Sequence, residues 1–181
     1  MTPLLRKGLM VASLHVAIVA SLGAKLVVDR ATRPRVWARA APVDPNLPIR
    51  GRYVSLRLEA AVGQGLDLPE PTTVVNPNGS TWTRAPQSVR VVLSERNQHL
   101  VALPSSDASG LYARASQRDG QSVAVLDQPL AYFIPEHVAD PSRRATGEEL
   151  WVEVTIPRRG APRPIRLGVK KDGVLTALDV N

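Results

Sequence analysis

The longest uncharged stretch of the chain is the feature that most constrains how it can fold. Residues 8–24 (GLMVASLHVAIVASLGA) carry no formal charge at neutral pH, and residues 26–28 (LVV) extend the apolar character past Lys25. A helix that crosses a bilayer needs about 20 apolar residues, so the stretch suffices if the Lys25 side chain extends toward the headgroups. We predict an N-terminal transmembrane anchor over residues 1–28.

A cleaved signal peptide is the competing interpretation of the same segment. Arg6 and Lys7 would form its basic region, and Ser21 and Gly23 are small residues at the two positions that a peptidase recognises. The apolar stretch is longer than the roughly 7 to 15 residues of a signal peptide, which favours an uncleaved anchor. An imidazole at His15 within the stretch is explained by a neutral ring that faces a partner helix.

The basic residues that flank this segment bear on its orientation and on its partners. The net charge of +7 is concentrated here, and by the positive-inside rule the excess after the segment favours a cytoplasmic domain, from Lys25, Arg30, Arg33, Arg35 and Arg39. Basic residues beside an apolar run are attracted to anionic headgroups, so we expect membrane association and no nucleic-acid partner. Cysteine is absent, which excludes disulfides and thiolate chemistry.

The remainder of the chain, residues 51–181, is predicted to form one strand-rich domain after a linker over residues 29–50 that is rich in Pro and Arg. Residues 52–62 alternate apolar and polar side chains, as a half-buried strand does. Further strands are predicted at 89–93, 99–103, 111–115, 122–126, 150–156, 165–169 and 174–180. Residues 171–173 (KDG) and Asn78-Gly79 are turn signals, and only 135–139 and 142–149 have room for short helical turns. The fold class is therefore mainly β, a sandwich or a partly open barrel.

Two short segments resemble a known family. Residues 41–45 (APVDP), followed by Gly51, Tyr53, Val54 and Leu56, are similar to the motif of the GDYXXLXY proteins, which are membrane-anchored bacterial proteins. Arg52 and Leu58 stand where that family has Asp and a final Tyr. Residues 132–136 (YFIPE) resemble a second family element, so the resemblance covers most of the chain.

The resemblance implies a single-pass protein of the bacterial inner membrane with most of the chain in the periplasm. It also implies a multi-spanning membrane protein as a partner, because family members are often found beside one. It supplies no activity, cofactor or catalytic residue. We interpret the motif residues as structural, since a glycine permits a turn into the sheet and Tyr53 and Leu56 fall on opposite strand faces; the full set is Gly51, Tyr53, Leu56, Tyr132, Phe133, Pro135 and Glu136.

The sequence contains no recognisable catalytic or cofactor motif. It has no phosphate-binding loop, no dinucleotide fingerprint and no pair of histidines at helical spacing, so we predict a non-enzymatic protein without a metal or cofactor. A serine hydrolase is the rival, with Ser55 or Ser80 as nucleophile and Lys170 or Lys171 as base. A metal held by Glu136, His137 and Asp140 is a further alternative, and so is a cytoplasmic-facing domain that binds anionic lipid through Arg30 to Arg39.

Overall fold

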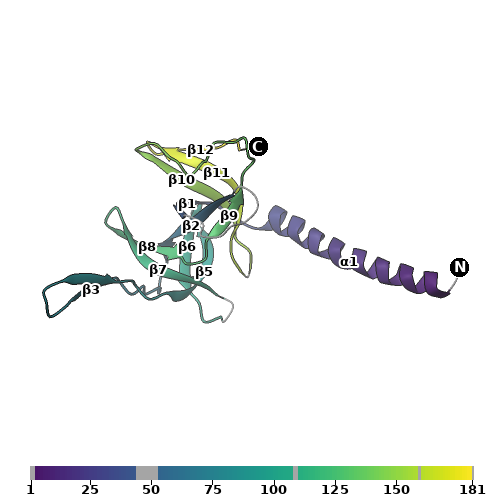
Figure 1. The fold of residues 1–181 in the computed structure, drawn as a ribbon, viewed down its shortest axis with the longest axis horizontal. Coiled ribbons are helices and arrows are strands. Elements are labelled where there is room, and N and C mark those ends of the chain that lie inside the picture. The colour runs from purple at the N-terminus through teal and green to yellow at the C-terminus, as the bar shows by residue number, and fades with distance from the viewer. Residues whose placement is uncertain (1–2, 44–52, 108–109, 159, 181) are drawn as a thin grey trace. The chain divides into compact units, whose positions relative to one another are not determined.

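The computed structural model of the protein describes residues 3–43, 53–107, 110–158 and 160–180. It divides into two compact units, Met1–Arg33 and Pro34–Asn181. The first unit consists of one helix and the second of strands, as Figure 1 shows for each unit taken by itself. The prediction of a mainly β fold with one N-terminal apolar helix is confirmed.

Helix α1 (Pro3–Thr32) contains a segment, residues 6–29, that is long and apolar enough to cross a membrane. Its 24 residues would extend about 36 Å at about 1.5 Å per residue, more than the roughly 30 Å of a hydrocarbon core. A signal sequence near an N-terminus has a similar length and apolar composition. His15 Nδ1 lies 2.8 Å from the carbonyl oxygen of Val11, so the helix itself provides a partner for the imidazole.

Six strands of the second unit close into a mixed β-barrel. In order around the barrel they are β1 (Arg35–Val43), β6 (His99–Pro104), β5 (Val89–Arg96), β7 (Leu111–Arg118), β8 (Gln121–Leu126) and β2 (Tyr53–Val62), and β2 then pairs with β1. Strand β6 runs parallel to both β1 and β2, whereas the other barrel pairs are antiparallel. Closure leaves the barrel strands with few unpaired edges.

The barrel closes because β1 and β2 change partners along their length, which is how strands turn corners between sheets. Residues 35–39 of β1 pair with β10 and residues 40–43 pair with β2. Residues 53–56 of β2 pair with β9, and residues 59–61 pair with β8. One long strand therefore belongs to two sheets in each case.

The remaining strands are additions to the barrel. A three-stranded antiparallel extension continues from β1, formed by β10 (Glu148–Thr155), β11 (Arg163–Lys171) and β12 (Val174–Ala177). Strand β9 (Leu130–Phe133) pairs with β2. Strands β3 (Thr72–Val75) and β4 (Thr81–Arg84) form a separate ribbon, and this ribbon extends away from the barrel (Figure 1).

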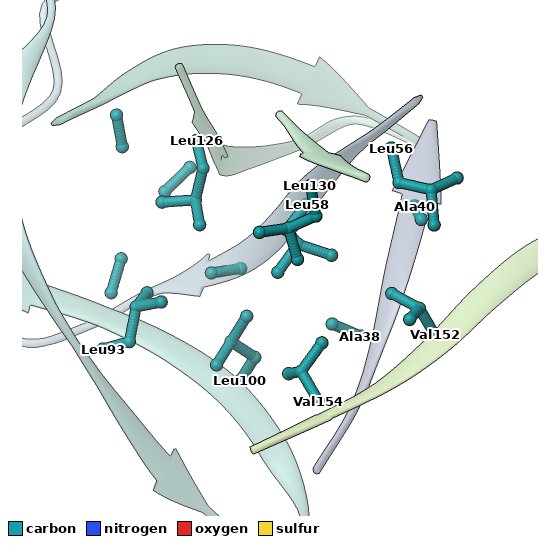
Figure 2. Packing of buried hydrophobic residues seen from close by; sticks show 14 of the residues in the cluster. Ala38, Ala40, Leu56, Leu58, Leu93, Leu100, Leu126, Leu130, Val152 and Val154 are labelled. Atoms are coloured by element: carbon teal, nitrogen blue, oxygen red, sulfur yellow. The ribbon is translucent and has the colours of Figure 1, made fainter. Parts of the chain in front are cut away.

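The core lies inside the barrel and beneath the extension. Side chains from β1, β2, β5, β6, β8, β9 and β10 converge there, as Figure 2 shows. Leu56 and Leu58 of β2 are completely buried, as is Val152 of β10. Truncating such a leucine to alanine typically costs about 2 to 5 kcal/mol. Aliphatic residues and alanine fill this core, in keeping with a chain that has only seven aromatic residues: three Trp, three Tyr and one Phe.

The predicted strands and the hairpin at residues 171–173 are present, with ends that differ by up to three residues. The linker predicted over residues 29–50 differs from the structure, because α1 continues to Thr32 and residues 35–43 form β1. The inward positions of β1 are taken by Val36, Ala38 and Ala40. Because alanine is small and only weakly apolar, its alternation with the outward residues is a weak signal of a strand. Residues 44–50 lie outside the described residues.

Three more strands, β3, β4 and β9, each of four residues, were not predicted. Residues 135–139 and 142–149, the segments with room for short helical turns, form no helix in the structure. Single hydrogen-bonded turns occur there instead, one of them closed by Val138 N donating to Pro135 O at 3.2 Å. Glu148 already belongs to β10.

Candidate functional site

A ladder of charged and aromatic side chains covers the outer face of β1, β10 and β11. Successive side chains of a strand point to opposite faces, and the alternate positions of these strands include the core residues Val36, Val152 and Leu167. The outer positions are Arg35, Trp37 and Arg39 of β1, Glu149, Trp151 and Glu153 of β10, and Arg166, Gly168 and Lys170 of β11. Trp37 lies opposite Glu153, and Trp151 lies opposite Gly168.

The indole of Trp37 is held by its neighbours on β10 and β11. A Cβ atom on Gly168 would lie 2.8 Å from Trp37 Cζ3, so the ring occupies the space that a side chain would need. The guanidinium carbon of Arg166 lies 5.3 Å from the centre of the Trp37 ring. Arg166 Nε also donates to Glu153 Oε2 at 2.8 Å. Stacking and ion pairing thus fix the orientation of this indole.

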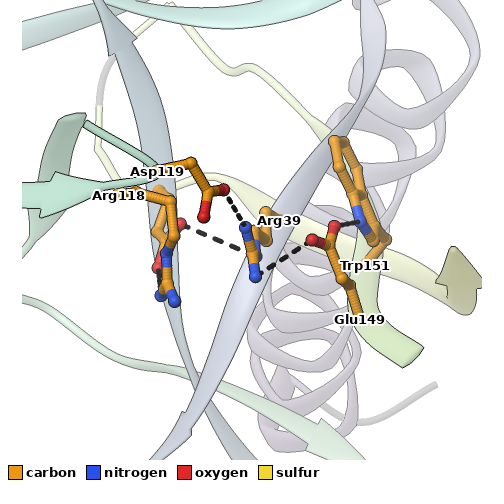
Figure 3. Close-up of polar contacts among 6 residues, drawn as sticks. Arg39, Arg118, Asp119, Glu149 and Trp151 are labelled. Carbon is orange, nitrogen blue, oxygen red and sulfur yellow. Dashed lines mark hydrogen bonds and ion pairs between the residues drawn. The ribbon is translucent and has the colours of Figure 1, made fainter. Parts of the chain in front are cut away.

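The indole of Trp151 is fixed in a similar way. Its Nε1 donates to Glu149 Oε2 at 3.0 Å, and Lys170 Nζ lies 4.8 Å from the ring centre. The other carboxylate oxygen of Glu149 lies 3.1 Å from Arg39 Nη2. Glu149 therefore connects the tryptophan to the charged cluster drawn in Figure 3.

That cluster is centred on Glu59 of β2, whose side chain is only 8% exposed. Arg118 Nη2 donates to Glu59 Oε1 at 2.6 Å, and this bond raises the pKa of Arg118. Arg39 Nε lies 3.9 Å from Glu59 Oε2, and Arg39 Nη1 lies 3.8 Å from the exposed carboxylate of Asp119. Two guanidinium groups thus face three carboxylates, and the opposite charges largely neutralise one another.

Two adjacent hollows open on this face, and we call them together the tryptophan groove. Trp37, His99, Trp151 and Lys170 line both. The first, the network pocket, has a volume of about 330 Å³ and contains the cluster around Glu59. The second, the basic pocket, has a volume of about 370 Å³, and its remaining lining residues are Arg35, Val36, Gln98, Gly173 and Leu175. No carboxylate lines the basic pocket among the described residues.

The two motif segments predicted from the sequence lie side by side as β2 and β9. Tyr53 is opposite Phe133, with ring centres 6.2 Å apart, and Leu56 is opposite Leu130, both in the core. Burial raises the pKa of the Tyr132 hydroxyl. Gly51 lies outside the described residues.

The last two motif residues follow β9. Pro135 accepts the hydrogen bond that closes the turn, and Glu136 is exposed within that turn. Neither lines the tryptophan groove. A structural role for the motif stays a prediction.

The residues considered for catalysis or metal binding are placed apart. Ser55 is buried and lines a hollow of about 270 Å³ next to Asp140 and Ser142. Among the described residues, this hollow shares no lining residue with the groove that contains Lys170. Ser80 is hydrogen-bonded to two asparagines in the β3–β4 ribbon. Within the described ranges, no three His, Asp or Glu side chains are grouped to hold a metal.

The tryptophan groove was not predicted from the sequence, although a signal for it exists. Both Trp37 and Trp151 stand at outward positions of alternating strands, with charged residues two positions away. Outward strand positions are normally polar, so a tryptophan there indicates a binding surface. The strand β1 had to be recognised before this signal could be used.

The model of the GDYXXLXY protein family matches residues 16–167, which is most of the chain. No curated protein and no solved structure matches the chain.

Proposed function

Because the chain belongs to the GDYXXLXY protein family, we propose that it is a single-pass protein of the bacterial inner membrane that binds a membrane protein through its barrel unit. In this proposal α1 remains uncleaved and the barrel unit lies in the periplasm. The barrel unit is not an enzyme.

The observation that carries the proposal is the direct continuation of the apolar helix into the barrel. Helix α1 ends at Thr32 and β1 begins at Arg35, so two residues connect them. If α1 spans a bilayer, the three residue steps from Thr32 to Arg35 reach at most about 10 Å and keep the start of β1 close to the membrane surface. A barrel held there can meet a membrane partner without a long linker.

The chemistry of the groove supports binding rather than catalysis. Its carboxylates are paired with arginines, and its indoles are fixed by stacking and hydrogen bonds. Aromatic and arginine side chains are the residues that contribute most to protein interfaces. Of the residues considered for the rival hydrolase, Ser55 and Lys170 line different hollows.

The first test is protease accessibility of the full-length chain with a C-terminal tag in spheroplasts, with fractionation and mobility on a gel. We expect an uncleaved, membrane-bound species that is digested from outside. Protection until the membrane is lysed would contradict the periplasmic orientation, and a shortened soluble species would contradict the anchor. Labelling of the chain by a serine-reactive fluorophosphonate would contradict the non-enzymatic assignment.

A second test locates the partner surface. A photocrosslinking amino acid replaces Asp119 at the rim of the network pocket, and the control carries it at Val75 in the β3–β4 ribbon; both positions are exposed. We expect crosslinks to an integral membrane protein from position 119 and fewer from position 75. Equal crosslinking from both positions would contradict binding through the groove.

A further inference from the structure

The basic pocket lies on the strand that directly follows the anchor, and its lining combines cations with indoles. We propose that it binds the phosphate of an anionic phospholipid in the membrane that α1 enters. The proposal rests on membrane insertion of α1 and does not depend on the protein partner.

The first argument is the charge of the pocket. Arg35 and Lys170 line it together with His99, and the carboxylate opposite Lys170 on β10, that of Glu149, has other partners. Glu149 contacts Arg39 and the Trp151 indole. A pocket with cations and no carboxylate in its described lining attracts a negatively charged group.

The second argument is the contrast between two neighbouring lysines of β11. Lys171 lies 3.6 Å from Glu148, so it has an ion-pair partner. Lys170 points to the opposite face, where its ammonium lies over the Trp151 ring, and no carboxylate within 4.0 Å is found among the described residues. Its ammonium is held over the indole at the boundary of the two hollows, and its positive charge remains available to an anion.

The third argument is the distance along the chain from the membrane segment to the pocket. The apolar run ends at Val28 and α1 ends at Thr32, which adds about 6 Å at about 1.5 Å per residue. Arg35 follows three residues later, at most about 10 Å farther. With α1 inserted, Arg35 lies within about 16 Å of the hydrocarbon edge, and the headgroup layer itself is several ångströms thick.

The fourth argument is the pair of indoles that flank the pocket. Trp37 and Trp151 line it from β1 and β10, and tryptophan is enriched where proteins meet the membrane interface. Their amphipathic rings suit the glycerol and phosphate region, where each nearby basic residue contributes about 1 kcal/mol with anionic lipid. A headgroup in this pocket would fix how the barrel rests on the bilayer.

The test compares the reactivity of the two lysines in the full-length, uncleaved chain. The protein is reconstituted in nanodiscs of phosphatidylcholine, with or without phosphatidylglycerol, and treated briefly with an acetylating ester. Fragment mass spectrometry then gives the ratio of Lys170 to Lys171 acetylation. We expect phosphatidylglycerol to lower this ratio about fivefold, since Lys171 serves as the internal control for general surface charge.

Two matched variants separate a specific site from diffuse attraction. Arg35→Gln removes a residue of the pocket lining, whereas Arg33→Gln removes the same charge two residues earlier, from an arginine outside that lining. We expect Arg35→Gln to abolish the lipid effect and Arg33→Gln to retain it. Equal loss in both variants would show that general electrostatics suffices and would overturn the proposal.

Two further outcomes also overturn it. An acetylation ratio in the wild-type chain that is the same in both lipids would show that no headgroup reaches the pocket. A fall in the ratio produced by inorganic phosphate in discs of phosphatidylcholine alone would assign the pocket to a free anion instead. Failure of the partner crosslinking leaves this result unaffected, so the two proposals are tested separately.

Discussion

The turn between β5 and β6 contains two residues in the left-handed backbone region, and one of them is poorly suited to it. Asn97 and Gln98 have φ angles of 53° and 63°, and Arg96 pairs with His99 across them. Asparagine adopts this conformation at little cost, whereas glutamine is strained in it. The corresponding second position is glycine in the other two tight hairpins, at Gly120 and Gly173. We predict that Gln98→Gly stabilises the barrel.

The magnitude follows from two opposing terms. Replacing a non-glycine residue in the left-handed region removes about 1 to 2 kcal/mol of backbone strain. The greater freedom of glycine in the unfolded chain lowers the folding stability by about 0.5 to 1 kcal/mol. The net gain is about 0.5 to 1 kcal/mol. The backbone N of Gln98 donates to Glu95 Oε1 at 2.6 Å, and a glycine at this position retains that donor.

Unfolding in urea, followed by tryptophan emission of the full-length chain in detergent, measures this difference. We expect a higher midpoint with an unchanged slope for Gln98→Gly, and a thermal midpoint raised by about 2 to 3 °C for a unit of this size. The reciprocal variant Gly173→Gln should lose about the same free energy that Gln98→Gly gains. A neutral or destabilised Gln98→Gly would refute the argument from backbone conformation.

Three other predictions concern the groove and the motif. Glu59→Gln should lower the free energy of unfolding in urea by about 1 to 2 kcal/mol. This is less than the loss of a fully buried ion pair, because the arginine partners of Glu59 contact solvent. Asp119→Asn should change it by no more than about 0.5 kcal/mol. Gly168→Ala should cost about 1 to 3 kcal/mol through its clash with Trp37, and less in a Trp37→Leu background; equal costs would contradict the clash. Because burial raises the pKa of Tyr132 in the folded state, its contribution to stability is complete below about pH 10 and is lost as pH rises above it. Tyr132→Phe should reduce that alkaline loss, measured by unfolding at a series of pH values.

Much of the fold follows from local patterns in the sequence. Residues 52–62 alternate clearly because large aliphatic side chains fill one face, and the structure places a strand there. The Asp172-Gly173 turn was identified because few residues other than glycine adopt the required backbone angles. Closure into a barrel could not be predicted, because it depends on β1 and β2 changing partners midway. Such pairing is a property of the assembled sheet.

The motif residues could be found from the sequence, but their arrangement could not. Tyr53 and Phe133 are 80 residues apart in the chain and become direct neighbours only when β9 pairs with β2. The groove depends even more on assembly, since His99 joins the two tryptophans through the parallel pairing of β6 with β1. Long-range pairing of this kind leaves no local pattern.

The two tryptophans of the groove differ in how far packing alone explains them. Trp37 fills the space above Gly168, so a structural role accounts for its position. Trp151 faces outward, and the contacts that orient it come from Glu149 and Lys170, both of which line the groove. If the groove served stability alone, we would expect Lys170 to form an ion pair with a carboxylate, as its neighbour Lys171 does with Glu148. A lysine held on an indole above a pocket without carboxylates in its described lining is better explained by a ligand that supplies the negative charge.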